Sequence, residues 1–343
     1  MATFTGSDNA DNINGTGLAD QIFGRGGADN LVGLEGNDVI EGGAGADGIF
    51  GSMGFDYASY RGSSQGVYAS LTDLLGHYGD AEGDHFYGIE GLIGSAYRDL
   101  LAGSEENDIL YGEGGNDQLG GFDGNDKLYG GDGNDLLEGG AGNDRLDGGA
   151  GTDTASLYNY SSGVVADLAK GTATGSYTGT DTLIGIENLT GTPYADRLAG
   201  DGRANVLDGA FNADVLTGRG GADRFDYNQA YYSPPTSPDR ITDFSRSQGD
   251  KIDFRDVDAN ARRDGVQDLT LNRQGGVHRR GPAPLLPVGR PHLHRGQHLG
   301  RDGRAGAGDR PRPFDRHDGR RFPAVTTGRR RAGRNGIARP ARA

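Results

Sequence analysis

The stretch GGDGNDLLEGGAGNDRLDGGAGTDTA at residues 130–155 decides the fold. It repeats a nine-residue unit, G-G-x-G-x-D-x-U-x, in which U is apolar. Glycine adopts left-handed backbone angles without steric cost, so the G-G-x-G segment predicts a tight turn. The triplet x-U-x predicts a minimal strand whose apolar side chain points to one face. Two units therefore predict one coil, with a turn and a strand on each side.

The same unit extends through three runs of the chain. Its eighth position is apolar throughout, from Ile13 to Ala58, from Leu101 to Ala155 and from Leu198 to Phe225. The alternative, a disordered Gly/Asp-rich linker, would not need an apolar residue at every ninth place. We therefore predict an all-β fold, a parallel β-roll (β-helix solenoid). The sixth-position residues are Asp11, Asp20, Asp29, Asp38, Asp47 and Asp56, then Asp99, Asp108, Asp117, Asp126, Asp135, Asp144 and Asp153, then Asp196, Asn205, Asp214 and Asp223.

Stacked coils bring the carboxylates of these units together. Turns on one edge recur in every second unit, so Asp117 and Asp135 share one edge while Asp126 and Asp144 share the other. Stacked carboxylates repel unless a cation lies between them. Carboxylate and carbonyl oxygens form a hard donor set that suits Ca²⁺ better than Mg²⁺. We expect every sixth-position aspartate to bind metal, together with turn carbonyls. The expected carbonyls are those of Gly42, Gly43, Gly45, Gly112, Gly114, Gly121, Gly124, Gly130, Gly131, Gly133, Gly139, Gly140, Gly142, Gly148, Gly149 and Gly151.

The three runs resemble the calcium-binding nonapeptides of RTX (repeats-in-toxin, haemolysin-type) proteins. The resemblance covers about seventeen units and implies a parallel β-roll with several Ca²⁺ ions between successive turns. The units at 6–14, 94–102 and 191–199 lack the second and third turn glycines, and Asn205 stands where an aspartate is expected. The best sites are therefore expected within residues 112–153.

Two inserts separate the runs. Residues 60–93 and 157–190 match each other at an offset of 97 without a gap. Both predict short strands around a polar loop, as hairpin-like covers or as wider coils that interrupt the stack. The expected organisation is repeats at 1–59, 94–156 and 191–226, inserts at 60–93 and 157–190, a cap at 227–273 and a tail at 274–343. Four tyrosines are expected to pack at the junctions rather than bind a ligand. They are Tyr57, Tyr60, Tyr158 and Tyr160.

The segment after the third run resembles the C-terminal region of serralysin-type metallopeptidases. The resemblance implies a cap on the roll, truncated here, which leads to an uncleaved export signal for type I secretion machinery. It makes Asp250 and Asp253 candidate cation ligands, although a solvated turn is the preferred interpretation. The matching residues are Phe225, Tyr227, Ile241, Asp243, Phe244, Asp250, Lys251, Ile252 and Asp253.

The charge of the chain is split. The net charge is −15, but residues 274–343 carry +13 and residues 1–273 carry −28. A basic tail can be a disordered nucleic-acid-binding arm. We prefer a shifted reading frame, because the tail can be back-translated so that one other frame restores a serralysin-type C-terminus. We expect the tail to be disordered and to have no nucleic-acid partner.

Catalysis is not expected. The sequence has no H-E-x-x-H zinc motif. The G-x-S-x-G pattern occurs at residues 62–66, but no nucleophile elbow is expected, and His77 and His85 are expected to be solvated loop residues. The absence of cysteine excludes disulfides and thiolate metal sites. No apolar run is long enough for a membrane span, and residues 1–15 lack the features of a signal peptide.

The sequence therefore predicts an extracellular, monomeric calcium-binding β-roll that folds on Ca²⁺ after export and has no catalytic domain. One alternative is the repeat and export half of a secreted serralysin-like metallopeptidase. Another is an adhesin or saccharide-binding module that uses the inserts.

Overall fold

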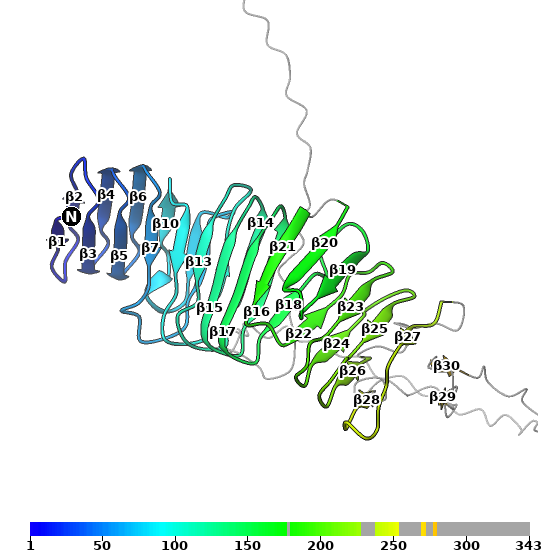
Figure 1. Ribbon diagram of the computed structural model, residues 1–343. Coiled ribbons are helices and arrows are strands. Elements are labelled where there is room, and N and C mark those ends of the chain that lie inside the picture. Colours follow the sequence, from blue (N-terminus) through cyan, green and yellow to red (C-terminus); the bar gives the residue numbers. More distant parts are fainter. Residues whose placement is uncertain (177–178, 228–236, 254–268, 272–276, 280–343) are drawn as a thin grey trace, which may run out of the picture. The chain divides into compact units, whose positions relative to one another are not determined.

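The structure is a computed structural model that describes residues 1–176, 179–227, 237–253, 269–271 and 277–279. The chain divides into two compact units, Met1–Leu285 and Leu286–Ala343, of which the second lies outside the described residues. The first unit is a stack of short strands joined by turns (Figure 1). None of its described helical structure is long or apolar enough to cross a membrane.

Two mainly parallel sheets run along the stack and face each other. The first sheet contains, in spatial order, β1 (Thr3–Thr5), β3 (Gln21–Gly26), β5 (Val39–Ala44), β7 (Tyr57–Ser59), β11 (Gly91–Ile93), β13 (Ile109–Tyr111), β15 (Lys127–Gly133), β17 (Arg145–Gly151), β21 (Gly179–Ile184), β20 (Thr172–Gly175), β19 (Val164–Asp167), β23 (Arg197–Ala199), β25 (Val215–Thr217) and β27 (Arg240–Ile241).

The second sheet is built from the alternate strands. It contains β2 (Asn12–Asn14), β4 (Asn30–Glu35), β6 (Gly48–Met53), β10 (His85–Tyr87), β9 (Leu75–His77), β8 (Tyr68–Ser70), β12 (Leu100–Ala102), β14 (Gln118–Asp123), β16 (Leu136–Ala141), β18 (Thr154–Ser156), β22 (Asn188–Thr190), β24 (Val206–Asp208), β26 (Arg224–Asp226) and β28 (Lys251–Asp253). A short 3-10 helix, η1 (Gly79–Ala81), lies in the first insert.

The strand register confirms the predicted coil. Leu128 of β15 pairs with Leu146 of β17, and Leu119 of β14 pairs with Leu137 of β16. Each pair joins the eighth positions of two units that are separated by one other unit, so two nonapeptides complete one coil. The all-β parallel roll predicted from the repeat is therefore correct.

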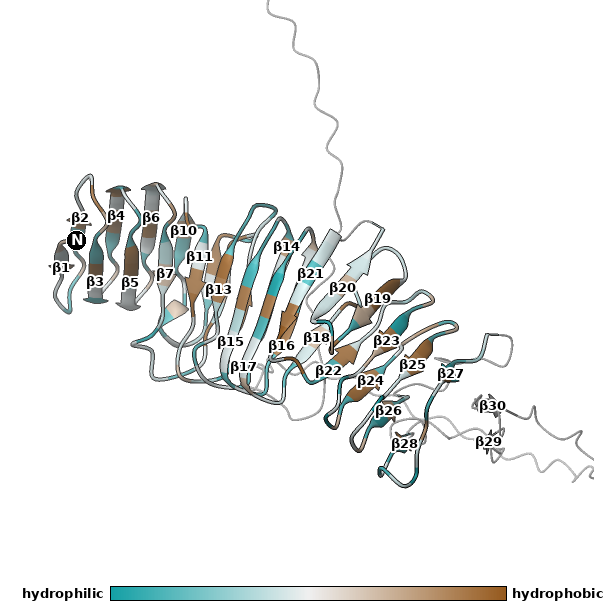
Figure 2. Cartoon of the chain, viewed as in Figure 1, coloured by the Kyte–Doolittle hydropathy of each residue, from teal (hydrophilic) through white to brown (hydrophobic). Residues whose placement is uncertain are grey.

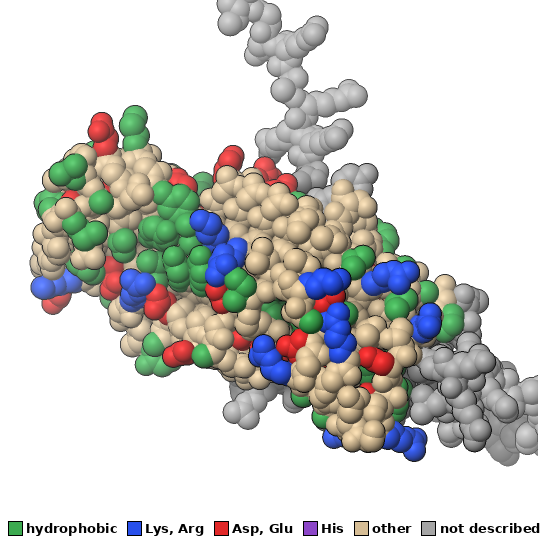
Figure 3. Space-filling model, in the orientation of Figure 1, with side chains coloured by type: hydrophobic (Ala, Val, Ile, Leu, Met, Phe, Trp, Pro, Cys, Tyr) green, Lys and Arg blue, Asp and Glu red, His purple; other side chains and the backbone are tan. Residues whose placement is uncertain are grey.

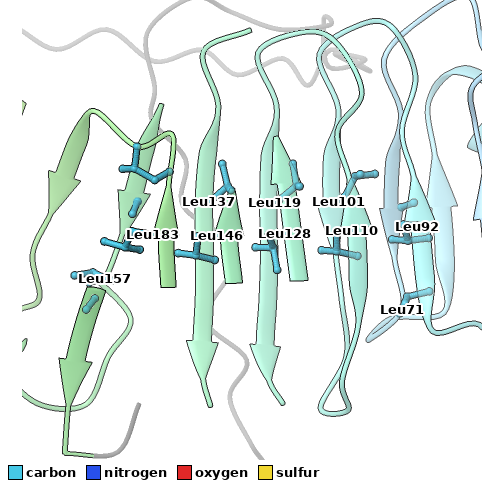
Figure 4. Packing of buried hydrophobic residues seen from close by; sticks show 14 of the residues in the cluster. Leu71, Leu92, Leu101, Leu110, Leu119, Leu128, Leu137, Leu146, Leu157 and Leu183 are labelled. Carbon is cyan, nitrogen blue, oxygen red and sulfur yellow. The ribbon is translucent and has the colours of Figure 1, made fainter. Parts of the chain in front are cut away.

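The core is a column of eighth-position side chains between the two sheets. Leu110, Leu119, Leu128, Leu137 and Leu146 are fully buried. Figure 4 shows leucines from successive coils stacked in this space, and Figure 2 shows hydrophobic segments along the strands between more hydrophilic turns. Because each triplet buries one apolar side chain, the stack depends on neighbouring coils for its stability.

The two inserts continue the sheets rather than interrupt them, and they do so on opposite sides. The first adds β8, β9 and β10 to the second sheet and β11 to the first sheet. The second adds β19, β20 and β21 to the first sheet and β22 to the second sheet. In each insert the middle strand, β9 or β20, is antiparallel to both neighbours. The strand before the insert sets the side, because β7 belongs to the first sheet and β18 to the second.

The two large sheets end at β27 and β28. β27 pairs with β25 and β28 pairs with β26, so residues 237–253 end both sheets. A separate antiparallel pair is formed by β29 (Leu269–Leu271) and β30 (Val277–Arg279). β30 lies in the tail that is predicted to be disordered, so that prediction is wrong for residues 277–279, which pair with a strand of the predicted cap. The rest of the cap and of the tail, with the proposed frame shift, lies outside the described residues.

Candidate calcium sites

The sixth-position aspartates form hydrogen-bonded ladders along the turn edges of the roll. The backbone N–H of Asp117 donates to Oδ1 of Asp135 at 2.8 Å, and that of Asp135 donates to Oδ1 of Asp153 at 2.8 Å. Asp126 and Asp144 are joined in the same way on the other edge. The same bond to the aspartate of the next coil recurs in all three runs. These ladders place the aspartates on the edges that the repeat predicts.

The second carboxylate oxygen divides the aspartates into two groups. In eleven of them Oδ2 is buried and has no hydrogen-bond partner among the described residues, and each of these residues is at most 2% exposed. Removing a carboxylate from water without a donor or a counter-charge is strongly unfavourable. Each of these eleven turns, here called interior turns, holds a carboxylate oxygen that a bound cation or a proton would compensate. Their aspartates are Asp29, Asp38, Asp47, Asp56, Asp117, Asp126, Asp135, Asp144, Asp153, Asp214 and Asp223.

The backbone of the interior turns is distinctive. Their second and fourth positions have positive φ, as at Gly131 (104°) and Gly133 (143°) in the turn of Asp135. Several interior turns hold this angle at their second position without glycine, including Leu34 (81°) and Phe122 (78°). Non-glycine residues adopt such angles at a cost. The turn geometry therefore belongs to the stacked coil and not to glycine alone.

The first turn glycine keeps space open between two oxygens. A Cβ added at Gly121 would lie 2.2 Å from Oδ2 of Asp126 and 2.5 Å from the carbonyl oxygen of Gly139 in the next coil. At Gly130 the corresponding contact with the next coil is 2.5 Å to the carbonyl oxygen of Gly148. A carboxylate oxygen and a carbonyl oxygen thus converge beside the first glycine of the turn. Any side chain at this position would fill the space between them.

Burial dominates the electrostatics of the interior turns. It raises the pKa of Asp117 and of Asp126 to about 8, with the neighbouring ladder carboxylates adding to the rise. Burial and the adjacent Asp239 raise the pKa of Asp214 to about 9. Asp117, Asp126 and Asp214 are thus held in an environment that disfavours their charge. Figure 3 shows only scattered acidic side chains on the visible face of the molecule.

The donor set fits a hard divalent cation. No cluster of three or more His, Asp or Glu side chains that could hold a metal is found in the described part of the chain. Seven interior turns instead bring one carboxylate oxygen beside a backbone carbonyl oxygen of the next coil, as Asp126 and Gly139 do at Gly121, and the first glycines of the other six turns of the repeats show the same pair of oxygens. Ca²⁺ takes six to eight oxygen ligands in flexible geometry, and carbonyls serve it well. Two successive turns together would supply more oxygen ligands than one turn, and most of these would be carbonyl oxygens.

Five predicted aspartates lie in a different kind of turn. Oδ2 of Asp108 accepts a hydrogen bond from the Ser104 hydroxyl at 2.9 Å and one from the Ser104 backbone N–H. Asp11, Asp20, Asp99 and Asp196 are held in the same way by Ser7, Thr16, Ser95 and Thr192. Asn205 accepts from the backbone N–H of Asp201 at 2.8 Å. These six turns, here called end turns, each begin a ladder.

The far ends of the ladders are formed by residues outside the nonapeptide runs, which the periodicity does not indicate. The N–H of Asp47 donates to Asp84 and that of Asp144 donates to Asp181. Other ladders end at Glu90, Glu187, Asp239 and Asp250. The sequence gives one indication of these residues, because Asp84 and Asp181 occupy equivalent positions in the two inserts, 97 residues apart. These six acids, here called closing residues, extend the ladders into the inserts and the cap.

Residue Asp250 corrects one expectation. It is 8% exposed, accepts from the N–H of Asp223 and from the N–H of Ser245, and so is not a solvated turn residue. Asp253 lies in β28, and one of its carboxylate oxygens is 4.0 Å from Nε of Arg224.

The two histidines of the first insert are exposed, as expected, but neither lies in a loop. His77 ends β9 and stacks on Tyr68, with ring centroids 5.6 Å apart. His85 begins β10, and its Nδ1 lies 3.0 Å from the carbonyl oxygen of Gly83. A three-residue strand with one buried side chain gives little alternation in the sequence, so the sequence pattern does not distinguish these strands from loops.

The four junction tyrosines pack within the protein. Tyr60 and Tyr160 are buried at the insert junctions, and their hydroxyls donate to closing residues. Tyr57 lies against Tyr111 with ring centroids 6.2 Å apart. Tyr158 lies against Phe211 with centroids 6.4 Å apart.

The roll places buried carboxylates and backbone carbonyl oxygens in successive turns. These are the oxygen ligands that a cation-binding repeat protein needs. A family model describing the RTX calcium-binding nonapeptide repeat, in four copies, matches residues 5–40, 23–58, 93–128, 120–155 and 190–225. The matched segments are RTX haemolysin-type repeats, and through them the protein binds several Ca²⁺ ions. A search of curated proteins found no match.

Proposed function

We propose that this protein is a secreted, monomeric β-roll that folds when its turns bind calcium, and that the repeats serve structure and not catalysis. The observation that carries the proposal is the set of eleven buried Oδ2 atoms without a donor in the described residues. A bound cation would offset the free-energy cost of burying these oxygen atoms.

Charge supports the coupling of binding to folding. Residues 1–273 carry a net charge of −28, and folding brings many of these carboxylates together in ladders that connect successive coils. Without a cation, mutual repulsion and desolvation oppose the roll. Calcium supplies positive charge at the turns when bound. Because the complete site exists only in the folded chain, binding free energy becomes folding free energy.

The chain's own residues orient the ligands. The N–H of each preceding ladder residue holds Oδ1 of the next aspartate and so directs Oδ2 toward the first turn glycine, as at Asp126 and Gly121. The positive φ angles at the second and fourth turn positions reverse the chain within the turn. The apolar column beneath, including Leu128 and Leu137, fixes the spacing of the coils.

Extracellular action is supported by the chemistry of the sites. Carbonyl-rich sites with one carboxylate per turn suit the millimolar calcium found outside cells better than the low calcium inside them. The resemblance of residues 225–253 to a serralysin-type C-terminal region supports export by type I secretion machinery. In the described part of that region, β27 and β28 end the two sheets as a cap would.

The test is a calcium titration of the full chain followed by far-UV circular dichroism. We expect little β signal in calcium-depleted buffer and a cooperative gain as calcium reaches the micromolar to millimolar range, reversed by chelation. A magnesium titration is the control and should produce a much smaller gain. A fully formed β spectrum without calcium, unchanged by its addition, would contradict calcium-dependent folding.

A further inference from the structure

We propose that each block of repeats is closed at both ends by turns that use the protein's own hydrogen-bond donors in place of calcium, so that calcium binds only at the interior turns. The blocks are residues 1–59, 94–156 and 191–226. This inference rests on the proposed calcium-dependent roll and specifies which of its aspartates are ligands.

The start of every ladder carries an internal donor. At Asp99, the Ser95 backbone N–H lies 2.6 Å from Oδ2 and the Ser95 hydroxyl lies 2.9 Å from Oδ1. At Asp196, Thr192 makes the same two contacts at 2.6 and 2.9 Å. A hydroxyl and an N–H provide two donors to a carboxylate that would otherwise be orphaned.

The backbone separates the two kinds of turn independently of the hydrogen bonds. Among the described residues, positive φ occurs at both the second and the fourth position in the eleven interior turns, and at neither position in the six end turns. The division by φ is the same as the division by Oδ2 partner. Two different local structures are therefore built on one repeat.

Three of the six closing residues, Asp84, Asp181 and Asp250, carry donors as well. The Tyr60 hydroxyl lies 2.9 Å from Oδ2 of Asp84, and the Tyr160 hydroxyl lies 2.7 Å from Oδ2 of Asp181. The backbone N–H of Ser245 donates to Oδ2 of Asp250 at 2.7 Å. A tyrosine hydroxyl reaching from each insert thus occupies the place that a cation would take in the next coil.

The sequence itself contains one natural substitution that fits this division. Asn205 is the amide among the seventeen sixth-position residues, and it lies in an end turn. Its Nδ2 donates to the carbonyl oxygen of Glu187 at 2.8 Å, a bond that an aspartate could not make. A neutral side chain is acceptable at an end turn because that turn has no cation to neutralise.

The decisive experiment compares Asp99→Asn with Asp117→Asn in the full chain. The two residues follow each other in one ladder, joined by a 2.8 Å bond from the N–H of Asp99 to Oδ1 of Asp117. Equilibrium dialysis counts the calcium ions bound per chain at saturation. We expect Asp117→Asn to lower the number by at least one ion and Asp99→Asn to leave it unchanged.

An equal loss of ions in the two variants would overturn the inference, and so would a loss confined to Asp99→Asn. Failure of the wild-type chain to bind calcium would instead contradict the proposed function, so the two failures are distinguishable. Both oxygens of Asp99 accept backbone N–H groups, from Val67 and Ser95, so Asp108→Asn and Asp126→Asn form a second pair. The backbone N–H and the hydroxyl of Ser104 both donate to Oδ2 of Asp108, as the N–H of Asp201 donates to Oδ1 of Asn205, and we expect the same ion counts.

A second comparison tests the hydroxyl itself. Ser104→Ala removes the cap of Asp108. Ser52→Ala changes an exposed serine at the same position of an interior turn, where φ is 86° and Oδ2 of Asp56 has no donor among the described residues. In saturating calcium we expect Ser104→Ala to lower the melting temperature by several degrees with an unchanged ion count, and Ser52→Ala to change neither. Equal melting temperatures for the two variants would contradict the role of the hydroxyl as a cap.

Discussion

The turns at residues 103–108 and 121–126 lie in consecutive coils on one edge of the roll, yet they close in different ways. Both begin with glycine and end with aspartate, and the N–H of Asp108 donates to Oδ1 of Asp126 at 2.8 Å. In the first turn Ser104 caps the carboxylate. In the second, Phe122 and Gly124 have φ of 78° and 129°, and Oδ2 of Asp126 is left without a donor in the described residues.

The difference teaches that one repeat can encode two physical roles. A hydroxyl after the first glycine satisfies the carboxylate locally and lets the backbone keep ordinary angles. An interior turn leaves one carboxylate oxygen buried and without a donor among the described residues, and a bound cation or a proton would compensate it. Four predictions contrast interior turns with end turns, from the largest expected effect to the smallest.

The largest effect is expected from a methyl group inside an interior turn. A Cβ at Gly133 would lie 1.4 Å from the carbonyl oxygen of Gly115, at φ of 143°. Gly133→Ala should therefore destabilise the calcium-loaded roll by about 3 kcal/mol or more. The control is Gly202→Ala in an end turn, where an added Cβ meets nothing within 4 Å. Thermal melts in saturating calcium measure both, and similar melting temperatures would contradict the strained-turn account.

The next effect concerns the carboxylates. Asp126→Ala removes a buried oxygen that lies beside Gly121, whereas Asn205→Ala removes only a hydrogen-bonded amide. We expect the calcium concentration at half-maximal folding to rise about tenfold for Asp126→Ala, equivalent to about 1.4 kcal/mol, and to rise less for Asn205→Ala. Circular dichroism during calcium titration measures the shift. Equal shifts would remove the distinction between the two kinds of turn.

A third prediction uses pH in calcium-depleted buffer. Burial raises the pKa of Asp117 and Asp126 to about 8, so the roll binds more protons than the unfolded chain, whose aspartates titrate near 3.8. The stability contributed by these groups is present below about pH 4 and is lost as pH rises through about 8. Among the end turns, hydrogen bonds from Ser7 and Ala2 lower the pKa of Asp11 and Asp20, whereas burial raises the pKa of Asp99 and raises those of Asp108 and Asp196 to about 6.

We therefore expect more β signal at pH 5 than at pH 9 without calcium. Saturating calcium should reverse the order, because ligand carboxylates bind the ion only when they are deprotonated. A β signal that increases from pH 5 to pH 9 in calcium-depleted buffer would contradict the raised pKa values.

The smallest effect tests the backbone alone. Leu34 occupies the second position of an interior turn at φ of 81° and is 41% exposed, so Leu34→Gly should stabilise the calcium-loaded roll by about 0.5 kcal/mol. Leu18 lies in the preceding end turn of the same ladder and is 68% exposed, without positive φ. Leu18→Gly should cost about 0.5 kcal/mol. Chemical denaturation in calcium measures both, and a loss of stability in Leu34→Gly would count against backbone strain there.

Much of the candidate site could be predicted from the sequence. The spacing of nine placed Asp117, Asp126, Asp135, Asp144 and Asp153 on alternating edges, and all five have an orphaned Oδ2. The sequence also indicates in part which turns are interior turns and which are end turns. The serine or threonine after the first glycine is visible at Ser95, Ser104 and Thr192. The sequence does not predict that this hydroxyl binds the aspartate of its own turn, because a serine or threonine in that position is equally typical of a solvated turn.

The closing residues could not be predicted in the same way. Asp84 and Asp181 align at the offset of 97, but the tyrosines that hold them do not, since Tyr60 lies 24 residues before its partner and Tyr160 lies 21 residues before. The two hydroxyls reach equivalent carboxylates from different places in the insert. Contacts of this kind depend on how the insert strands pack and not on a period.

By itself, the sequence determined the coil of two nonapeptides, the apolar column and the acidic edges, because each follows from a local repeat with one buried side chain per triplet. Only the tertiary structure decided that duplicate inserts enter opposite sheets and that the ladders end on tyrosine and backbone donors. The physical reason is that a turn's own residues define its geometry, whereas the partner of a buried carboxylate oxygen is supplied by whichever coil is stacked beside it.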